Sequence, residues 1–456
     1  YSTEEMLKLQ PSMNKAFETK DAALVPWGAV HWYANPYPQF PAPIQKHDIN
    51  RMIADWDADL FVSLQDIFMF QPGSFLCASA VWMPLHFLPV EHPTVLSLSD
   101  FDLQLPISGW GALLLEQLHG EKHGDKGVQT LRHIEVVPHG RNTEVFKPLG
   151  DLFDRAEFRA RWGWPDDAFV VLCIASNSEE SGRKAFDAQI QGFMKFAEKE
   201  PRAWLHIHSE VARAYDIGRL LETFGAWDKR ASFLDWRDHR VRTATDTPIR
   251  GSRVSVSHAS QLLNVAEDDL VKFYNAADVL LAATCSEGCG VPILEAQLCG
   301  LPVVTTRATA MWEETYIGVS VEPEQWIARM HFNSGWWLPH SKGIGIALHE
   351  IAAWSKEERA EKISIGRAKV SAEFADETVI RRWCEVLTKL QKELDTEFRS
   401  DSLRLHEARR LFLRFATLTR KQYSKARELG GEMDINMIKA KELVKLQGAA
   451  EALGGV

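Results

Sequence analysis

Residues 284–304 read Thr-Cys-Ser-Glu-Gly-Cys-Gly-Val-Pro-Ile-Leu-Glu-Ala-Gln-Leu-Cys-Gly-Leu-Pro-Val-Val, and this stretch decides the fold. Residues 278–283 before it form an apolar run of strand length, and the two glycines after the first glutamate supply the loose backbone of a tight turn. A helix is expected to open at Pro292, because proline is tolerated at the first helical position, and to stop at Gly300. With the next buried strand at 303–305, the stretch predicts a β-turn-α-β unit.

Two carboxylates, Glu287 and Glu295, stand eight positions apart around this turn. Ligands of an open parallel sheet bind beyond the carboxyl ends of the strands, so both glutamates are expected to reach one ligand. Carboxylates only accept hydrogen bonds, which suits the vicinal hydroxyls of a sugar, whereas backbone amides at the helix start suit a pyrophosphate. The amides expected at the phosphate are those of Gly288, Cys289, Gly290 and Val291. The spacing alone is equally consistent with two residues that bind no ligand: Glu295 would be a favourable charge in the first turn of the helix, and Glu287 a solvated loop residue.

The segment resembles the signature of the retaining GT-B glycosyltransferases of family 4, the glycosyl transferases group 1, in which Glu-Gly-Phe-Gly precedes a second glutamate. Cys289 stands where the family has an aromatic residue. The resemblance covers residues 60–390 and is strongest at 271–306. It implies that Glu287 contacts the donor sugar and that Glu295 holds the ribose of the nucleotide. It also implies an α/β GT-B fold, with two Rossmann-like domains facing a cleft.

The domain plan follows from length and from one further motif. A chain of 456 residues exceeds one compact core, which fits two Rossmann-like halves. Residues 136–148 read Val-Val-Pro-His-Gly-Arg-Asn-Thr-Glu-Val-Phe-Lys-Pro and resemble the family's hinge between those halves. We expect an acceptor-side domain at 1–148, a nucleotide-sugar-binding domain at 149–376 and a helical C-terminal extension at 377–456. The extension should begin with a helix over Glu377–Leu394 that crosses back to the first domain.

Alternating strand and helix patterns fill both halves. The first half has strand-like runs at 22–25, 60–64, 80–83, 94–98 and 134–137, with helical patterns at 44–57 and 110–118. The family opens with a strand and a glycine-bearing acceptor loop, whereas this chain opens on a polar, helix-like stretch over 4–20, so the N-terminus is expected to be truncated or divergent. Runs at 169–174 and 204–208 and a loop-rich stretch at 236–252 lead to the glutamate unit, which predicts a parallel sheet with helices on both faces.

Arg183 and Lys184 are the cationic side of the expected site. They precede a helix expected from Ala185 to Lys199, and two cations at a helix N-terminus oppose the helix dipole. Because their loop also follows a strand, a nucleotide diphosphate is the favoured partner, with arginine binding as a fork and lysine as a point charge. The family has an arginine and a lysine in the equivalent loop, at the diphosphate leaving group. The alternative is pairing with nearby acidic residues, namely Glu179, Glu180 or Asp187.

On the first domain, His86 follows the strand at 80–83 and is expected to face the cleft near the donor sugar, as a histidine does in the family. Asp66 and Asp100 are weaker candidates on the acceptor side. His206 and His208 share a strand face but lack a visible third ligand, so packing is favoured over a metal site. No P-loop or dinucleotide fingerprint occurs, and we expect neither a metal nor a cofactor.

Composition sets further bounds. The hydrophobic content of 45% is that of a globular protein. The net charge of −10 argues against binding of nucleic acid by the surface as a whole, although it does not exclude a local basic site. Six cysteines sit mostly in apolar runs, which favours reduced, buried thiols over disulfides; zinc at Cys285, Cys289 and Cys299 is the less favoured alternative. No apolar run is long enough for a membrane helix and no signal pattern opens the chain, so we expect a cytoplasmic protein.

Residues 399–427 hold nine Arg or Lys against two acidic residues, in a pattern typical of a basic amphipathic helix. Packing on the acidic body is favoured, with contact to an anionic membrane or to nucleic acid as the alternatives.

Together with these patterns, the family resemblance implies a glycosyltransferase that moves a hexose, with retention, from a nucleotide sugar, UDP- or GDP-linked, to a hydroxyl acceptor on a glycan, a lipid or a modified nucleic acid. Three alternatives stay open: a sugar-nucleotide epimerase of the same fold, a non-catalytic nucleotide-sugar-binding relative, and a phage-type DNA-modifying transferase. Additional acid/base residues opposite the sugar would mark the epimerase, the missing first loop favours the non-catalytic relative, and the basic segment favours the DNA-modifying enzyme.

Overall fold

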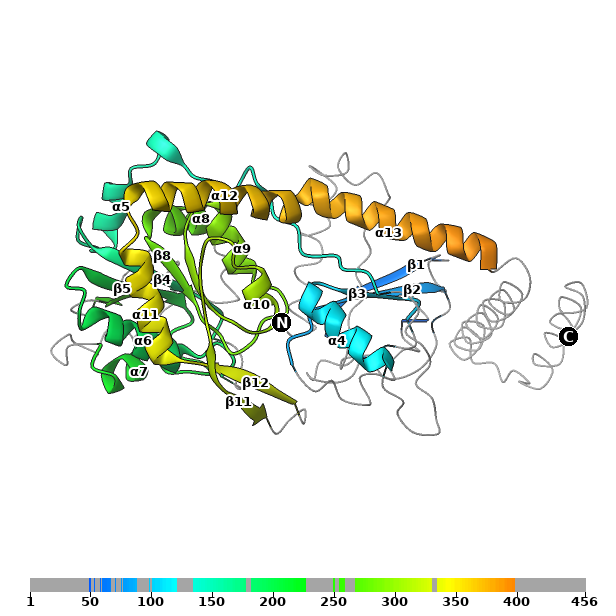
Figure 1. Cartoon of the computed structure of the whole chain (residues 1–456), viewed down its shortest axis with the longest axis horizontal. Helices are drawn as coiled ribbons and strands as arrows, with labels where there is room; N and C mark the ends of the chain where they lie inside the picture. The colour runs from blue at the N-terminus through cyan, green and yellow to red at the C-terminus, as the bar shows by residue number, and fades with distance from the viewer. Residues whose placement is uncertain are drawn as a thin grey trace, which may run out of the picture.

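The computed structural model describes residues 101–120, 134–177, 182–226, 249–250, 254–258, 267–329 and 334–397, together with short pieces between residues 49 and 98. The predictions for residues 4–20, 22–25 and 399–427 lie outside these ranges. Figure 1 shows two sheets side by side, with two long helices running along both.

The smaller sheet belongs to the first part of the chain and has the order β1-β2-β3, all parallel. Its elements are β1 (Leu60–Leu64), β2 (Ala78–Met83), β3 (Leu103–Pro106) and the helix α4 (Gly109–Gly120). The runs expected at 60–64 and 80–83 and the helix at 110–118 are confirmed. The strand expected at 94–98 is wrong where it can be checked, because Leu98 is helical.

The third strand of this sheet is β3, which the sequence pattern missed because it carries Gln104 at its centre. That side chain is fully buried and donates to the carbonyl oxygens of Leu98 and Phe101, at 3.0 and 2.6 Å. The run expected at 134–137 does not form a strand. It lies beside β3 through a single parallel bridge at Ile134 and through the amide of Val137, which donates to the carbonyl of Pro106.

The larger sheet has the order β10-β9-β8-β4-β5-β7-β6, parallel except for the short edge strand β6. Its strands are β4 (Phe169–Ile174), β5 (Ala203–Ser209), β6 (Ile249–Arg250), β7 (Val254–His258), β8 (Val279–Ala282), β9 (Val303–Thr306) and β10 (Gly318–Val321). The parallel sheet expected in this half is therefore confirmed. Strand β6 lies in the stretch expected to be loop, and β7 and β10 were missed. An antiparallel hairpin of β11 (Pro323–Arg329) and β12 (Ser334–Pro339) follows.

Helices cover both faces of this sheet, and each face has its own apolar core. One core packs α6 (Phe186–Ala197), α7 (Ile217–Thr223) and α11 (Ser341–Ala352) on the strands. The other packs α5 (Arg155–Arg161), α8 (Glu267–Ala276), α9 (Val291–Leu298) and the short α10 (Thr309–Glu313). Because β4 and β8 are adjacent parallel strands in this sheet, their carboxyl ends lie side by side at the same end of the sheet.

Two helices end the described chain: α12 (Lys356–Phe374) and α13 (Asp376–Glu397). Figure 1 shows α12 along the larger sheet and α13 along the smaller one. Val379, Val386 and Leu390 of α13 pack in one cluster with Ala80 and Leu105 of the smaller sheet. This is the crossing helix expected at 377–394; the domain limits themselves stay predictions. Among the helices that the structure describes, none has the length and apolar character that crossing a membrane would need.

Candidate active site

The β-turn-α-β unit predicted from residues 284–304 is present as β8, α9 and β9. Gly290 precedes the helix, Pro292 lies in its first turn, and Gly300 closes it with a left-handed φ of 81°. Arg183 and Lys184 lie at the equivalent edge after β4, just before α6, whose cap residue Ala185 has a φ of 47°. Because β4 and β8 are neighbours, the two loops meet.

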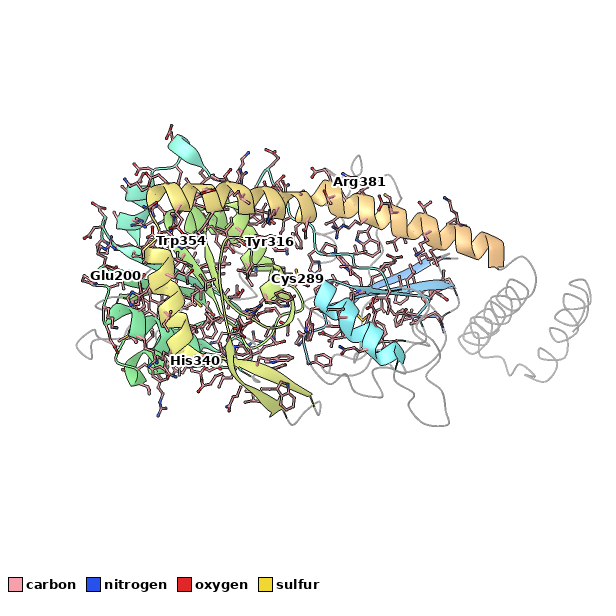
Figure 2. All side chains as sticks on the ribbon, in the orientation of Figure 1. Glu200, Cys289, Tyr316, His340, Trp354 and Arg381 are labelled. Atoms are coloured by element: carbon pink, nitrogen blue, oxygen red, sulfur yellow. The ribbon has the colours of Figure 1, made fainter. Side chains whose placement is uncertain are left out.

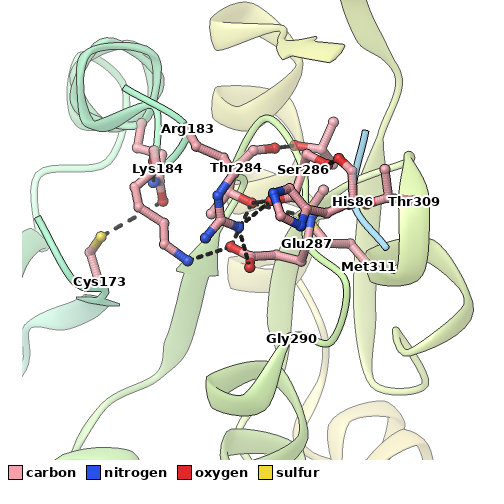
Figure 3. Close-up of polar contacts among 12 residues, drawn as sticks. His86, Cys173, Arg183, Lys184, Thr284, Ser286, Glu287, Gly290, Thr309 and Met311 are labelled. Atoms are coloured by element: carbon pink, nitrogen blue, oxygen red, sulfur yellow. Dashed lines mark hydrogen bonds and ion pairs between the residues drawn. The ribbon is translucent and has the colours of Figure 1, made fainter. Parts of the chain in front are cut away.

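Their meeting point is an ion cluster centred on Glu287 (Figure 3). Arg183 Nη1 donates to Glu287 Oε2 at 2.6 Å, and Lys184 Nζ donates to Oε1 at 2.7 Å. The hydroxyl of Thr284 donates to the same Oε1 at 3.0 Å. Arg183 also donates to the carbonyl of Ser286 at 2.7 Å, so the two loops are joined through side chain and backbone.

The charges of this cluster decide the protonation of Glu287. The residue is only 8% exposed, and burial alone would raise the pKa of its carboxyl. The adjacent Arg183 and Lys184 outweigh that cost and hold the pKa at about 2. Glu287 is therefore ionised at neutral pH. Of the acidic residues considered as alternative partners for the two cations, Glu179 and Glu180 lie outside the described residues.

The backbone of Glu287 is held as firmly as its side chain. Its amide donates to Thr309 Oγ1 at 3.1 Å, and its carbonyl accepts from the amide of Ala310 at 3.3 Å. Thr309 has a φ of 52°, a left-handed conformation that a threonine adopts only at a cost. The start of α10 therefore fixes the loop that carries Glu287.

The second glutamate, Glu295, lies in a separate buried group. Tyr274 of α8 donates its hydroxyl to Glu295 Oε2 at 2.9 Å, and Arg141 Nε lies 3.6 Å from Oε1. Burial raises the pKa of Glu295 to about 7, against the opposing effects of Arg141 and Tyr274. Neither partner was recognised from the sequence. The only available signal was a cation, Arg141, inside the expected hinge.

The amides expected to bind a phosphate are not all free. Gly290 N–H donates to Glu314 Oε2 at 2.7 Å, so this amide has a side-chain partner. Glu314 follows α10 and is 2% exposed. The phosphate roles of Gly288, Cys289, Gly290 and Val291 stay predictions. Cys289 lies on the side of the larger sheet that faces the smaller one (Figure 2).

The first half of the chain reaches the site through the segment after β2. Ser286 Oγ donates to the carbonyl of His86, and Figure 3 shows His86 beside Glu287. A Cβ on Gly288 would lie 2.6 Å from Pro84 Cβ and 2.8 Å from its Cα, so only glycine fits against this segment. The structure therefore brings His86, Arg183, Lys184 and Glu287 together.

A second contact between the halves lies beside the first. Both carboxylate oxygens of Glu313 in α10 accept from the amide of Trp110 in the first turn of α4, each at 3.2 Å. The ring of Trp110 lies edge-on to that of Trp337 in β12, with the centroids 6.2 Å apart. A carboxylate at a helix N-terminus is favourable, so Glu313 links α10 to the first half.

The structure describes most of the remaining candidate residues. Asp66 lies two residues after the end of β1, whereas Asp100 lies outside the described residues. His206 is packed as expected, because its ring nitrogens lie 2.7 and 2.9 Å from the hydroxyls of Ser255 and Ser257 in β7. His208 Nδ1 lies 2.7 Å from Ser257. All six cysteines are free, Cys384 being exposed, and the described residues contain no group of three metal-binding side chains.

Comparison with known proteins places this site in a family context. Residues 238–331 match the family model described as glycosyl transferases group 1. Mannosylfructose-phosphate synthase of Agrobacterium fabrum is 27% identical over 175 residues, which are 38% of this chain and 33% of that protein. The chain thus aligns with about a third of the length of this curated relative.

Solved structures resemble the chain over much more of its length. A glycosyltransferase from Rickettsia africae superposes with a TM-score of 0.54 at 12% identity, over 82% of this chain and 87% of the other. The UDP complex of Alr3699/HepE from Anabaena has a TM-score of 0.52 at 16% identity, over 75% and 82%. At such identities the likeness establishes the fold alone, and the GT-B fold expected from the sequence is confirmed.

Proposed function

We propose that this chain, a relative of the glycosyl transferases group 1 with the GT-B fold, transfers a hexose from a nucleotide sugar to a hydroxyl acceptor with retention of the anomeric configuration. The family match at 238–331 includes the loop of Glu287 and the helix of Glu295. The GT-B likeness extends over most of the chain.

One observation carries the proposal: two cations and a carboxylate meet at the carboxyl edge of a parallel sheet, where ligands of such sheets bind. Arg183 and Lys184 have side chains that are 11% and 17% exposed, and the single carboxylate of Glu287 pairs with both, which leaves the cluster with a net positive charge. A diphosphate offers the same kind of acceptor oxygens as that carboxylate. The site is therefore suited to exchange Glu287 for a donor diphosphate.

The reaction needs one bond broken and one formed at the anomeric carbon. As the bond to the β-phosphate oxygen breaks, Arg183 and Lys184 stabilise the negative charge that develops on the diphosphate. The acceptor oxygen bonds to the same face of the sugar, and its proton passes to the departing phosphate oxygen. Glu287, released from the cations, accepts from hydroxyls of the donor sugar, with His86 beside it (Figure 3).

The donor base is proposed to be uracil or guanine. The likeness to a GT-B protein solved with UDP supports uracil. A thermal-shift screen with UDP-, GDP-, ADP- and dTDP-sugars tests this choice. One donor is expected to raise Tm clearly above the others, because a ligand that binds only the folded state stabilises it. If no nucleotide sugar shifts Tm and none is hydrolysed, the proposed function is wrong.

At about pH 8, where Glu295 with its pKa of about 7 is mostly ionised, Glu295→Ala should weaken binding of the nucleotide selected by that screen by about 1.5–3 kcal/mol, since two ribose hydroxyls would lose a charged acceptor. Calorimetry with the nucleoside diphosphate measures the loss. Tyr274→Phe removes the hydroxyl that donates to Glu295 but leaves the carboxylate in place, so it serves as the control with a smaller effect. Unchanged diphosphate binding by Glu295→Ala would exclude the ribose role.

A further inference from the structure

Glu314 is a buried carboxyl group at the amino end of α9 that has no part in the mechanism above. Gly290 N–H, at the start of that helix, donates to its Oε2 at 2.7 Å, and the thiol of Cys289 is hydrogen-bonded to the same side chain. The backbone carbonyl of Glu314 accepts from Gln297 Nε2 of α9 at 2.8 Å. Side chain and backbone therefore both fasten residue 314 to α9.

Gln297 completes this attachment. Its Oε1 accepts from the amides of Tyr316 and Ile317, at 2.7 and 2.8 Å, and its Nε2 also donates to the carbonyl of Ile293. The segment 314–317 thus has little freedom to move away from the helix. With its backbone fixed in this way, the Glu314 side chain could leave the amino end of α9 only by a rotamer change that breaks the hydrogen bond from Gly290.

The surroundings of Glu314 disfavour its charged form. Burial is the largest effect, and the Gly290 amide and the Cys289 thiol oppose it only in part. The charged groups acting on it are the carboxylates of Glu313, the last residue of α10, and of Glu287 on the neighbouring loop, while the phenol of Tyr316 lies two residues further along the chain. The pKa of Glu314 is raised to about 8, so the residue is neutral at pH 7.

The contrast with Glu287 shows why this matters. Both glutamates are buried, but Glu287 has two cations as direct partners and is ionised, whereas Glu314 has an amide and a thiol. The amino end of a helix attracts anions through its amides and dipole. An ionised carboxylate at that position would compete with a bound diphosphate and repel it. A neutral carboxyl accepts the Gly290 hydrogen bond without adding charge.

We propose that Glu314 is a positioning residue for the donor diphosphate: through the hydrogen bond that it accepts from Gly290, its carboxyl holds the first turn of α9 in place, and a negative charge at this position weakens diphosphate binding. The inference rests on the proposed function, because it assumes that the diphosphate lies at this helix end. Glu314 is not a catalytic residue, since it acts through the α9 backbone.

Calorimetry with UDP and GDP, each compared with its nucleoside, tests the proposal at about pH 7.5 and about pH 9.5. Glu295, with a pKa of about 7, is mostly ionised at both values, and its remaining titration would strengthen binding rather than weaken it. For the unchanged protein, diphosphate affinity should fall about tenfold or more over this range, and nucleoside affinity much less. Glu314→Gln keeps an acceptor for Gly290 but cannot ionise, so its affinity should stay level. Glu313→Gln, one residue away, should retain the fall.

Infrared difference spectra supply a readout that needs no ligand. A protonated-carboxyl band that titrates near pH 8 and is absent from Glu314→Gln is expected. Its absence at pH 7, or an equal alkaline fall in Glu314→Gln and the unchanged protein, would overturn the proposal. If neither UDP nor GDP binds the unchanged protein at pH 7.5 while UDP- and GDP-sugars also leave Tm unchanged, the proposed function itself fails for these two bases.

Discussion

Replacing Arg183 and Lys184 together by alanine is expected to lower kcat/KM for sugar transfer by at least about a thousandfold, because loss of one preorganised charge-stabilising donor already costs 10²–10³ in rate. Binding of the nucleoside diphosphate should weaken far more than binding of the nucleoside. Its dependence on salt should also flatten, since the lost contacts are ionic. Steady-state kinetics and calorimetry at two ionic strengths measure these effects.

The double variant needs controls for folding, because it leaves Glu287 buried without its two cations, and breaking a buried ion pair costs about 3–5 kcal/mol. Adding Glu287→Gln to the double variant removes that unpaired charge and should restore much of the stability but none of the transfer. Replacing Arg202 and Lys362, exposed cations paired with Glu200 and Glu358, should leave transfer intact. Equal weakening of nucleoside and diphosphate by the double variant would indicate misfolding rather than lost phosphate contacts.

The part of this site that could be predicted is the part that local signals define. An apolar run, a proline in a first helical turn and a left-handed glycine are enough to place β8, α9 and β9. The sheet-edge rule then brings Arg183 and Glu287 to one place although they are 104 positions apart. The sequence could not show that the carboxylate would pair directly with both cations, rather than lie across a ligand from them, because this depends on how the two loops pack.

The residues that were missed depend on contacts between elements that no local pattern specifies. Glu314 follows Trp312 and Glu313 at the end of a short helix, where a carboxylate usually faces water, and Trp312 is indeed 49% exposed. Glu314 is buried because the segment after α10 lies against α9, where Gly290 and Gln297 hydrogen-bond its side chain and its backbone. Tyr274 looks like ordinary core on α8, and only the position of α8 beside α9 gives its hydroxyl a partner.

Glu287→Gln is expected to separate donor binding from turnover. Transfer should be lost, because the proposed contact to the donor sugar needs the carboxylate. The free nucleoside diphosphate should nevertheless bind about tenfold more tightly, since Glu287 no longer competes for Arg183 and Lys184, and a charged hydrogen bond contributes about 1.5–3 kcal/mol. Calorimetry and single-turnover kinetics measure the two effects.

The same variant should change the acid stability of the protein. The pKa of Glu287 is lowered from 4.5 to about 2 in the folded state. The contribution of the ionised Glu287 to the free energy of unfolding is therefore complete above 4.5, its pKa in the unfolded chain, and is lost as the pH falls from 4.5 toward 2. The pKa shift corresponds to about 3 kcal/mol in the free energy of unfolding between neutral and acid pH. Glu287→Gln should remove this part of the pH dependence.

Glu144→Gln is the matched control, because Glu144 forms an exposed ion pair with Lys147 and its side chain is 85% exposed. It should alter neither diphosphate affinity nor acid stability. If Glu287→Gln weakens the diphosphate as strongly as it slows transfer, Glu287 holds the donor phosphate region in place instead of competing with it. A tighter diphosphate together with lost turnover would show that the ion cluster of the ligand-free protein is exchanged when the donor binds.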